Sequence, residues 1–451
     1  MKNKQTVKQS LLPVLSISKG TFIWLLTGSL FLFCNKSEAQ DISLLSLGNQ
    51  FQQTYINPAA TLKNTWNISL GNTQTEILTD GPTYNQLTDL NKAGRRYIHP
   101  DNWQSDVNYD NLIQANFAIH TLDLGMVRNT WTFSGGHAFR SFGSLAYTED
   151  LLKLVANGNG PYINQDLEIG PALDYLVFNE LYLGVQKKFN RFTVGLKAKA
   201  LFGVSGLRTQ ASSVTYKTKD DFYQWEFLVD YNIKSSSSLT LRDVTDFEFN
   251  GSGFTFDHLF YNNPGIAFDI GVSMQLSKDL SIFWSALDLG FIKWDFLPRN
   301  YNSQGKFTFE GIDPITYIND TMGLQFIDSI AQFFPFTTVN ESFTTSLNNR
   351  FYLGGSYNWK DTWSFQGLVR FNRFFVKSNT QFSVSAIRQW KWIQAGGSYT
   401  VTNGSYFNLG AIVQLQLKPL SVFLATDNIL GAFSLFDQKL ANLRGGAQIA
   451  F

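Results

Sequence analysis

Few residues in this sequence have the types and spacing that catalysis requires. The residues best suited to nucleophilic or metal chemistry are four histidines and one cysteine, His99, His120, His137, His258 and Cys34. No serine or aspartate is placed beside any of these histidines in a way that defines a catalytic pair. The serine-hydrolase elbow, the His-Glu-x-x-His zinc motif and the phosphate-binding glycine loop are also absent from the sequence. We therefore predict a protein that is not an enzyme and that has no catalytic residue, metal or cofactor.

Charged residues that interrupt otherwise uncharged strand faces are the more informative group. Five of them are expected to line the interior of a barrel: Lys197, Lys199, Asp269, Arg370 and Lys418. A cation on the lipid side of a membrane strand costs about 2 to 4 kcal/mol at mid-depth, so these side chains should point inward. Two interpretations stay open. They line a pore and bias its selectivity, or they pair with one another across the lumen.

The elements that carry these charges alternate apolar residues with polar or small ones. The pattern is clear from Phe192 to Val204, from Ile266 to Leu276 and from Phe407 to Leu417. These stretches run roughly 10 to 14 residues, longer than soluble strands and long enough to cross a bilayer when tilted. After the N-terminal region, no apolar run approaches the ~20 residues of a membrane-spanning helix. The sequence predicts an all-β protein, a transmembrane antiparallel β-barrel of about 14 strands (12 to 16).

The connections between the expected strands fall into two size classes. Tight turns are expected near residues 188–191, 277–279, 359–361, 389–391 and 418–419, and long loops near 76–110, 235–262 and 297–343. Short turns on one side and long loops on the other are typical of outer-membrane barrels. Aromatic residues beside the turns predict an interfacial girdle, made by Phe189, Trp359, Trp363, Trp390 and Trp392. Packing in a protein core is the alternative for each of them. Short loop helices are expected over 149–157, capped by Thr148, and over 320–334.

The N-terminal region reads as a secretory signal over residues 1–39. Lysines precede an apolar stretch, and small residues lead to a cleavage site between Ala39 and Gln40. A lipid anchor on Cys34 is the alternative, but the bulky Phe33 before it does not fit the small residue expected there. Removing 1–39 takes away five lysines and one glutamate, which leaves 36 − 5 = 31 basic and 35 − 1 = 34 acidic residues. The resulting charge of −3 gives no reason to expect a nucleic-acid partner.

Residues 40–64 precede the first expected strand and are too polar to cross a membrane. We predict that this segment, with Phe51, Asn57 and Pro58, folds into the barrel as a plug and occludes the lumen, and that residues 65–451 form the barrel. At the other end, Leu443, Gly445, Ala447, Ile449 and Phe451 share one strand face. Phe451 is therefore expected to face lipid and to act as the signal that barrel-assembly machinery recognises.

Several separated motifs resemble an uncharacterised outer-membrane barrel family of Bacteroidota. They are Asn57-Pro58-Ala59, Asn263-Pro264-Gly265-Ile266-Ala267-Phe268-Asp269-Ile270-Gly271, Asp288-Leu289-Gly290-Phe291-Ile292-Lys293-Trp294, Thr426-Asp427-Asn428-Ile429 and Asn442-Leu443-Arg444-Gly445-Gly446. The resemblance spans essentially the whole chain after the signal. More distantly, the chain is similar to fatty-acid-transporter barrels and to barrel subunits of type IX secretion. These relatives imply about fourteen strands and a lumenal N-terminal segment, but they supply no functional residue.

These observations leave two functions open for a protein of the cell outer membrane, in contact with its lipid. The first is a passive, porin-like channel or transporter for small or hydrophobic solutes. The second is a non-transporting accessory barrel that docks a lipoprotein or a secretion machine through its long loops. The sequence does not identify a substrate or a specific partner.

Overall fold

The structure is a computed structural model of the chain. This structure describes residues 41–48, 50–90, 96–98, 107–221, 224–237, 239–241, 247–249, 259–309, 336–360, 362–373 and 377–451. The expected signal with its cleavage site at Ala39 and Gln40, and the expected helix over 320–334, lie outside these residues. Within them, no helix is long and apolar enough to cross a membrane.

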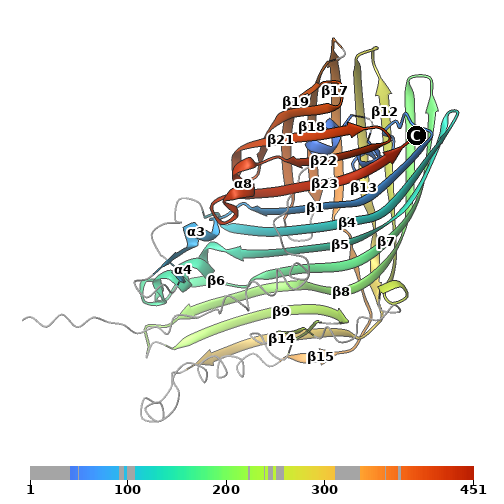
Figure 1. Cartoon of the computed structure of the whole chain (residues 1–451). Coiled ribbons are helices and arrows are strands. Elements are labelled where there is room, and N and C mark those ends of the chain that lie inside the picture. Colours follow the sequence, from blue (N-terminus) through green and yellow to red (C-terminus); the bar gives the residue numbers. More distant parts are fainter. Residues whose placement is uncertain are drawn as a thin grey trace, which may run out of the picture.

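Fourteen antiparallel strands close into a ring (Figure 1). Strand β1 pairs with both β4 and β23, which joins the first and last strands of the barrel. The strands in ring order are β1 (Trp66–Thr79), β4 (Asp110–Arg128), β5 (Trp131–Thr148), β7 (Ala172–Phe189), β8 (Phe192–Thr218), β12 (Pro264–Gln275), β13 (Leu280–Trp294), β17 (Asn349–Trp359), β18 (Trp363–Arg373), β19 (Asn379–Gln389), β20 (Ile393–Thr402), β21 (Ser405–Leu417), β22 (Leu420–Thr426) and β23 (Leu440–Ala450). The predicted fold class is confirmed.

Smaller elements are not part of this ring of strands. The N-terminal segment holds α2 (Ile42–Ser46) and the 3-10 helix η2 (Phe51–Tyr55). The connections hold α3 (Tyr84–Leu87), β2 (Thr88–Leu90), β3 (Arg96–Ile98), α4 (Glu149–Asn157), η3 (Gly160–Tyr162), β6 (Asp166–Glu168), β9 (Trp225–Ser237), β10 (Leu239–Leu241), β11 (Phe247–Phe249), β14 (Pro298–Phe309), β15 (Thr337–Val339), β16 (Phe343–Ser346), α8 (Ile429–Phe433) and η5 (Leu435–Asp437). The Thr148 side chain caps α4 and Gly158 ends it, as the sequence predicts.

One end of the barrel has short turns and the other has long connections. The backbone N–H and C=O of Phe451 bond to Trp66 at the short-turn end, at 3.0 and 2.8 Å, so the last residue closes the ring there. Four of the five expected girdle aromatics, Phe189, Trp359, Trp390 and Trp392, are 42 to 51% exposed beside these turns. Phe451 is 63% exposed. Apolar side chains therefore face outward at this end of the wall.

The wall forks at β8, which is 27 residues long. Its first part pairs with β12, from Phe192 to Phe202, and its later part pairs with β9, from Ser205 to Thr218. Strand β9 then pairs with β14, and β14 with β15. These three strands extend the sheet beyond the ring at the long-loop end (Figure 1).

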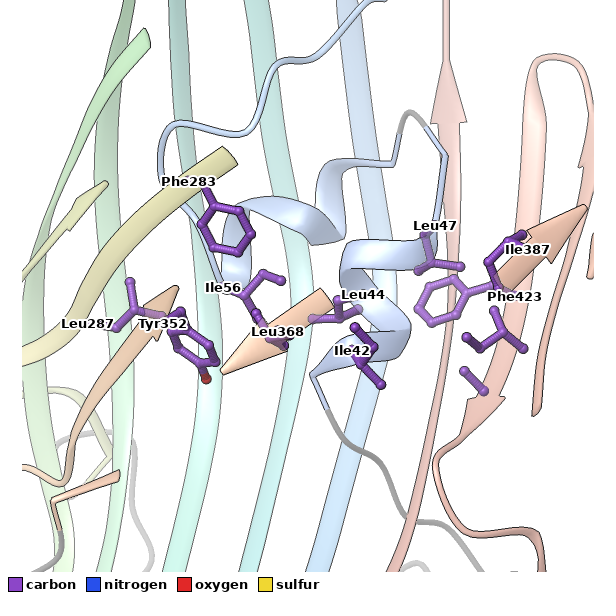
Figure 2. Packing of buried hydrophobic residues seen from close by; sticks show 12 residues of the cluster. Ile42, Leu44, Leu47, Ile56, Phe283, Leu287, Tyr352, Leu368, Ile387 and Phe423 are labelled. Carbon is purple, nitrogen blue, oxygen red and sulfur yellow. The ribbon is translucent and has the colours of Figure 1, made fainter. Parts of the chain in front are cut away.

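The N-terminal segment lies inside the barrel at the short-turn half. Four apolar residues of the segment, Ile42, Leu44, Leu47 and Ile56, are at most 1% exposed. They pack against wall residues Phe283, Tyr352, Leu368, Ile387 and Phe423 (Figure 2). The main apolar cluster of this half of the molecule is therefore made jointly by the segment and the wall.

Candidate functional site

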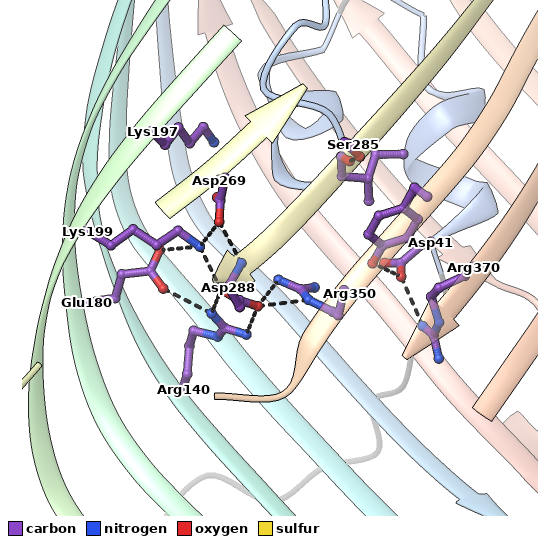
Figure 3. A network of polar contacts seen from close by, with 12 residues as sticks. Asp41, Arg140, Glu180, Lys197, Lys199, Asp269, Ser285, Asp288, Arg350 and Arg370 are labelled. Atoms are coloured by element: carbon purple, nitrogen blue, oxygen red, sulfur yellow. Dashed lines mark hydrogen bonds and ion pairs between the residues drawn. The ribbon is translucent and has the colours of Figure 1, made fainter. Parts of the chain in front are cut away.

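A group of charged side chains crosses the lumen next to the N-terminal segment. We call six of them, all on wall strands, the wall cluster: Arg140, Glu180, Lys199, Asp269, Asp288 and Arg350 (Figure 3). Its centre is Asp288, which is 1% exposed. The Asp288 carboxylate lies 2.7 Å from a nitrogen of each of three cations, Arg140, Lys199 and Arg350. One buried carboxylate thus joins three strands besides its own, because Arg140, Lys199 and Arg350 come from β5, β8 and β17.

The backbone at Asp288 explains how a residue of β13 reaches this position. Its φ angle is 61°, in the left-handed region that aspartate tolerates better than most residues. The pairing of β13 with β12 shifts register between Phe268 and Ile270, which marks a β-bulge at Leu287 and Asp288, opposite Asp269. The Asp288 N–H donates to the Asp269 carboxylate at 2.8 Å. A bulge turns a side chain away from the face that strict alternation gives it, and here it directs Asp288 into the cluster.

The remaining acids of the wall cluster balance its cations. Lys199 lies 2.8 Å from Asp269 and 3.5 Å from Glu180, and Arg140 lies 3.0 Å from Glu180. Three cations therefore face three carboxylates. Buried charges persist only when they are paired in this way, since an unpaired charge in the interior is costly.

A second group holds the N-terminal segment, and we call it the tether cluster: Asp41, Glu76, Tyr352, Arg370 and Arg444. Asp41 accepts from Arg370 at 2.9 Å, from Arg444 at 2.8 Å and from the Tyr352 hydroxyl at 2.6 Å. Arg370 also bonds both Glu76 oxygens at 3.0 Å. Burial alone would raise the pKa of Asp41, but the facing guanidiniums of Arg444, Arg370 and Arg350 outweigh it and hold that pKa well below its usual value. Asp41 is therefore a charged anchor for the segment.

Further hydrogen bonds complete the attachment of residues 41–62. The Gln50 side chain donates to Ser421 at 2.9 Å, the Phe51 N–H donates to Gln448 at 2.6 Å, and Lys197 donates to the Thr54 carbonyl at 2.8 Å. Together with the tether cluster, such bonds reach twelve of the fourteen ring strands, β1, β4, β7, β8, β12, β13, β17, β18, β19, β20, β22 and β23. The segment is thus fixed around nearly the whole circumference.

Two paired glycines make room for the segment where it contacts β8 and β12. Gly195 and Gly271 are register partners, and the chain at Asn57, Pro58 and Ala59 packs against both. A Cβ on Gly195 would lie 2.1 Å from the Pro58 carbonyl oxygen, and a Cβ on Gly271 would lie 2.5 Å from the Asn57 side-chain oxygen. No larger residue fits at either position without displacing the segment.

A small cavity of about 80 Å³ lies between the two clusters. Its lining includes the polar residues Arg140, Asp288, Arg350, Arg370 and Arg444 and the apolar residues Phe142, Leu176, Phe178 and Leu347. This volume has room for several water molecules but not for a solute of ordinary size. The space between the two clusters is therefore small.

The structure brings most of the sequence-predicted site residues together. Lys197, Lys199, Asp269 and Arg370 are 3 to 5% exposed and point into the lumen, where each has polar partners. Phe51, Asn57 and Pro58 lie in the lumenal segment. The prediction for Lys418 is wrong. It lies exposed in the turn between β21 and β22, because the strand alternation that places it inward ends at Leu417.

Sequence reasoning missed seven charged residues of the two clusters: Asp41, Glu76, Arg140, Glu180, Asp288, Arg350 and Arg444. The available signal was a single charge within a largely uncharged strand, as at Asp288 between Leu287 and Leu289. Within the described ranges, no group of three or more His, Cys, Asp or Glu residues is arranged to hold a metal ion.

The chain belongs to the family of unknown function DUF5723, which it matches over residues 58–427. The resemblance of its motifs to an uncharacterised barrel family is thereby confirmed, while the assignment to Bacteroidota stays a prediction. No curated protein matches the sequence.

Several solved structures resemble the chain, with little sequence identity. The toluene transporter TbuX of Ralstonia pickettii is 9% identical, with 90% of this chain and 94% of that chain covered and a TM-score of 0.43. A FadL homologue of Pseudomonas aeruginosa is 11% identical, with 90% and 95% covered and a TM-score of 0.39. The toluene transporter TodX of Pseudomonas putida is 8% identical, with 92% and 93% covered and a TM-score of 0.36.

Proposed function

We propose that the chain is an outer-membrane channel for small or hydrophobic solutes, with a lumen narrowed by its own residues 41–62. The observation that carries the proposal is a closed barrel whose interior holds a tethered segment beside a cavity lined by both charged and apolar residues. Outward apolar residues and the aromatics at the short turns support a membrane location. The short turns then lie in the periplasm and the long connections outside the cell.

The width of the lumen limits how solutes pass. Because residues 41–62 are bonded across the lumen to twelve of the fourteen ring strands, passage of a larger molecule requires part of the N-terminal segment to move. The polar bonds between the segment and the wall are individually modest and exchangeable with water, so such movement needs no break in the barrel itself. The segment therefore acts as the restriction, and the wall as the fixed frame.

Liposome swelling tests the channel directly. The purified barrel is reconstituted, and swelling rates are measured for a series of sugars of increasing size and for a small aromatic solute. Uptake that falls steeply with solute size supports a narrowed channel. Absence of uptake for every solute, by a barrel that is folded and inserted, would contradict it.

A non-transporting accessory barrel is the second candidate. The observation that favours it is the attachment of residues 41–62 to twelve strands, which suits a permanent seal as well as a restriction. In this case the long-loop end docks a lipoprotein or a secretion machine. Affinity purification from native membranes separates the candidates, because a stoichiometric partner favours docking and an isolated barrel favours transport.

A further inference from the structure

Strand β22 stops before it has crossed the wall. It has 7 residues, whereas its neighbours β21 and β23 have 13 and 11. The chain continues as α8 and η5, and α8 contacts both neighbours where β22 would otherwise run (Figure 1). The wall therefore has a notch between β21 and β23 at the long-loop end.

Polar side chains replace the missing strand ladder on the inner side of this notch. The Thr426 hydroxyl donates to the Asn442 carbonyl at 2.7 Å, the Asp427 N–H donates to the Asn442 side chain at 2.8 Å, and Asn428 donates to the Leu440 carbonyl at 2.7 Å. Asp427 and Asn428 are at most 1% exposed. These bonds give hydrogen-bond partners to backbone carbonyl groups on the part of β23 that β22 leaves unpaired, and they are buried away from water.

Helix α8 covers the notch from outside. Arg444 and Gln448 point into the lumen, where they bond the N-terminal segment, so Ala441 lies on the opposite, outer face of β23. Ala441 is nevertheless only 2% exposed, and a Cβ on Gly431 of α8 would lie 3.1 Å from its Cβ. The helix is therefore packed on the outer surface of the barrel.

The side of α8 that faces away from the wall is an apolar patch, made by Leu430 and Phe433, which are 55 and 84% exposed. Phe436 of η5 lies at its edge, where its ring packs against Tyr84 of α3 at 5.0 Å between ring centroids. Phe407 on the adjoining strand β21 is 64% exposed. Large apolar groups that share an exposed surface usually mark a contact with lipid or protein.

The depth of this patch indicates which contact it makes. Ala441 precedes Phe451 by 451 − 441 = 10 residues along β23, and Phe451 lies at the short-turn border. At about 3.3 Å per residue and a tilt of about 40°, ten residues rise roughly 25 Å, which is the height of the apolar band of an outer-membrane barrel. The patch is thus level with the far border of that band and continuous with the outward apolar surface.

We propose that Leu430 and Phe433 insert among the acyl chains at the outer-leaflet border, so that lipid completes the wall over the β22 notch. The inference rests on the membrane location in the proposed function. It adds a specific lipid-contact element, which makes α8 an anchor of the barrel's outer rim.

Site-directed spin labelling tests this in lipid nanodiscs. The chain from Gln40 onward contains no cysteine, so single cysteines can be introduced without other changes. The test site is Phe433→Cys. Leu424→Cys, on β22 and 56% exposed, is the lipid-facing control, and Val155→Cys, on the loop helix α4 and 40% exposed, is the aqueous control. Collision rates with oxygen, which favours lipid, are compared with those with a water-soluble nickel chelate.

The proposal expects an oxygen-to-nickel ratio at residue 433 close to that at residue 424 and several times that at residue 155. A ratio at 433 equal to that at 155 would overturn it, because the patch would then be in water. Low collision with both reagents, with dipolar broadening between labels, would overturn it in favour of a second copy. If residue 424 is itself accessible to nickel, the membrane location in the proposed function fails instead.

Discussion

The wall cluster and the tether cluster contain the same types of charged residue but connect different parts of the molecule. They adjoin in the lumen, since Arg350 of the wall cluster and Tyr352 of the tether cluster are two residues apart on β17. Every member of the wall cluster belongs to a ring strand, whereas the tether cluster depends on Asp41 of the N-terminal segment. The difference teaches that one group of buried charges joins ring strands to one another, and the other joins the N-terminal segment to the wall. Substitutions should therefore separate stability from permeability.

The largest effect is expected from Asp288→Asn. It leaves Arg140, Lys199 and Arg350 without their shared carboxylate, and removing one partner of a buried ion pair costs about 3 to 5 kcal/mol. Urea titration of the refolded barrel measures the loss. Asp166→Asn, in an exposed pair with Lys217, is the control and should change the free energy of unfolding by less than about 1 kcal/mol. Equal effects of the two substitutions would show that the wall cluster does not brace the barrel.

A smaller loss of stability but a larger change in permeability is expected from Asp41→Asn. Glu76 still neutralises Arg370 in this variant, so the loss should be about 2 kcal/mol, the scale of a hydrogen bond to a charged group. Arg444 loses its counter-ion, so planar-bilayer recordings should show more frequent opening and a preference for anions. If the variant opened no more often than the parent and showed no preference for anions, Asp41 would not hold the segment in place.

Steric displacement of the segment tests the same contrast without altering charge. Gly195→Ala and Gly271→Ala place a methyl group against the segment at Pro58 and Asn57, so each should raise liposome permeability, with a loss of stability of about 1 to 3 kcal/mol from overpacking. Gly367→Ala is the matched control, because a Cβ there meets nothing within 4 Å. Similar permeability for all three variants would mean that the segment does not restrict the lumen at this contact.

The smallest effect is expected from mild acid. Since the pKa of Asp41 is held below the value of about 3.9 for a free aspartate, its contribution to stability is fully present above that value and is lost as pH falls below it. Asp41 therefore stays charged throughout the interval from pH 8 to pH 5. Bilayer conductance should therefore be the same at pH 8 and pH 5. If the channel opened between pH 8 and pH 5, and Asp41→Asn abolished this pH-dependent opening, Asp41 would be titrating in that interval, which would contradict its role as a permanently charged anchor.

Much of the fold could be predicted from the alternation of apolar and polar residues, because the two faces of a ring strand meet different surroundings. The sheet extension that begins at β8 could not be predicted in this way. Its strand β14 is rich in polar residues and contains Pro298 and Gly305, which indicate a loop. It forms a strand because β9 offers it a paired edge along its whole length. The expected loop over 297–343 therefore begins with a strand.

The candidate site was predictable in part, for a related reason. Lys197, Lys199 and Arg370 fall on regular strands, so their inward direction follows from spacing. On β13, Phe283 and Ile292 are both buried although they are nine residues apart, because the bulge at Asp288 reverses which residues face the lumen. Strict alternation along β13 therefore assigns the residues on one side of the bulge to the wrong face. Asp41 lies in a segment without strand periodicity, and its partners are hundreds of residues away in the sequence. Only the folded barrel brings them together.

The central claim is that residues 41–62 restrict a lumen framed by the wall cluster. Single-channel conductance of the barrel with and without residues 40–61 tests it most directly, with urea titration to verify that both forms are folded. The account predicts a larger conductance after deletion and a shift of the reversal potential toward anions, because Arg444 and Arg370 then face Glu76 alone. An unchanged conductance in a folded deletion variant would contradict it.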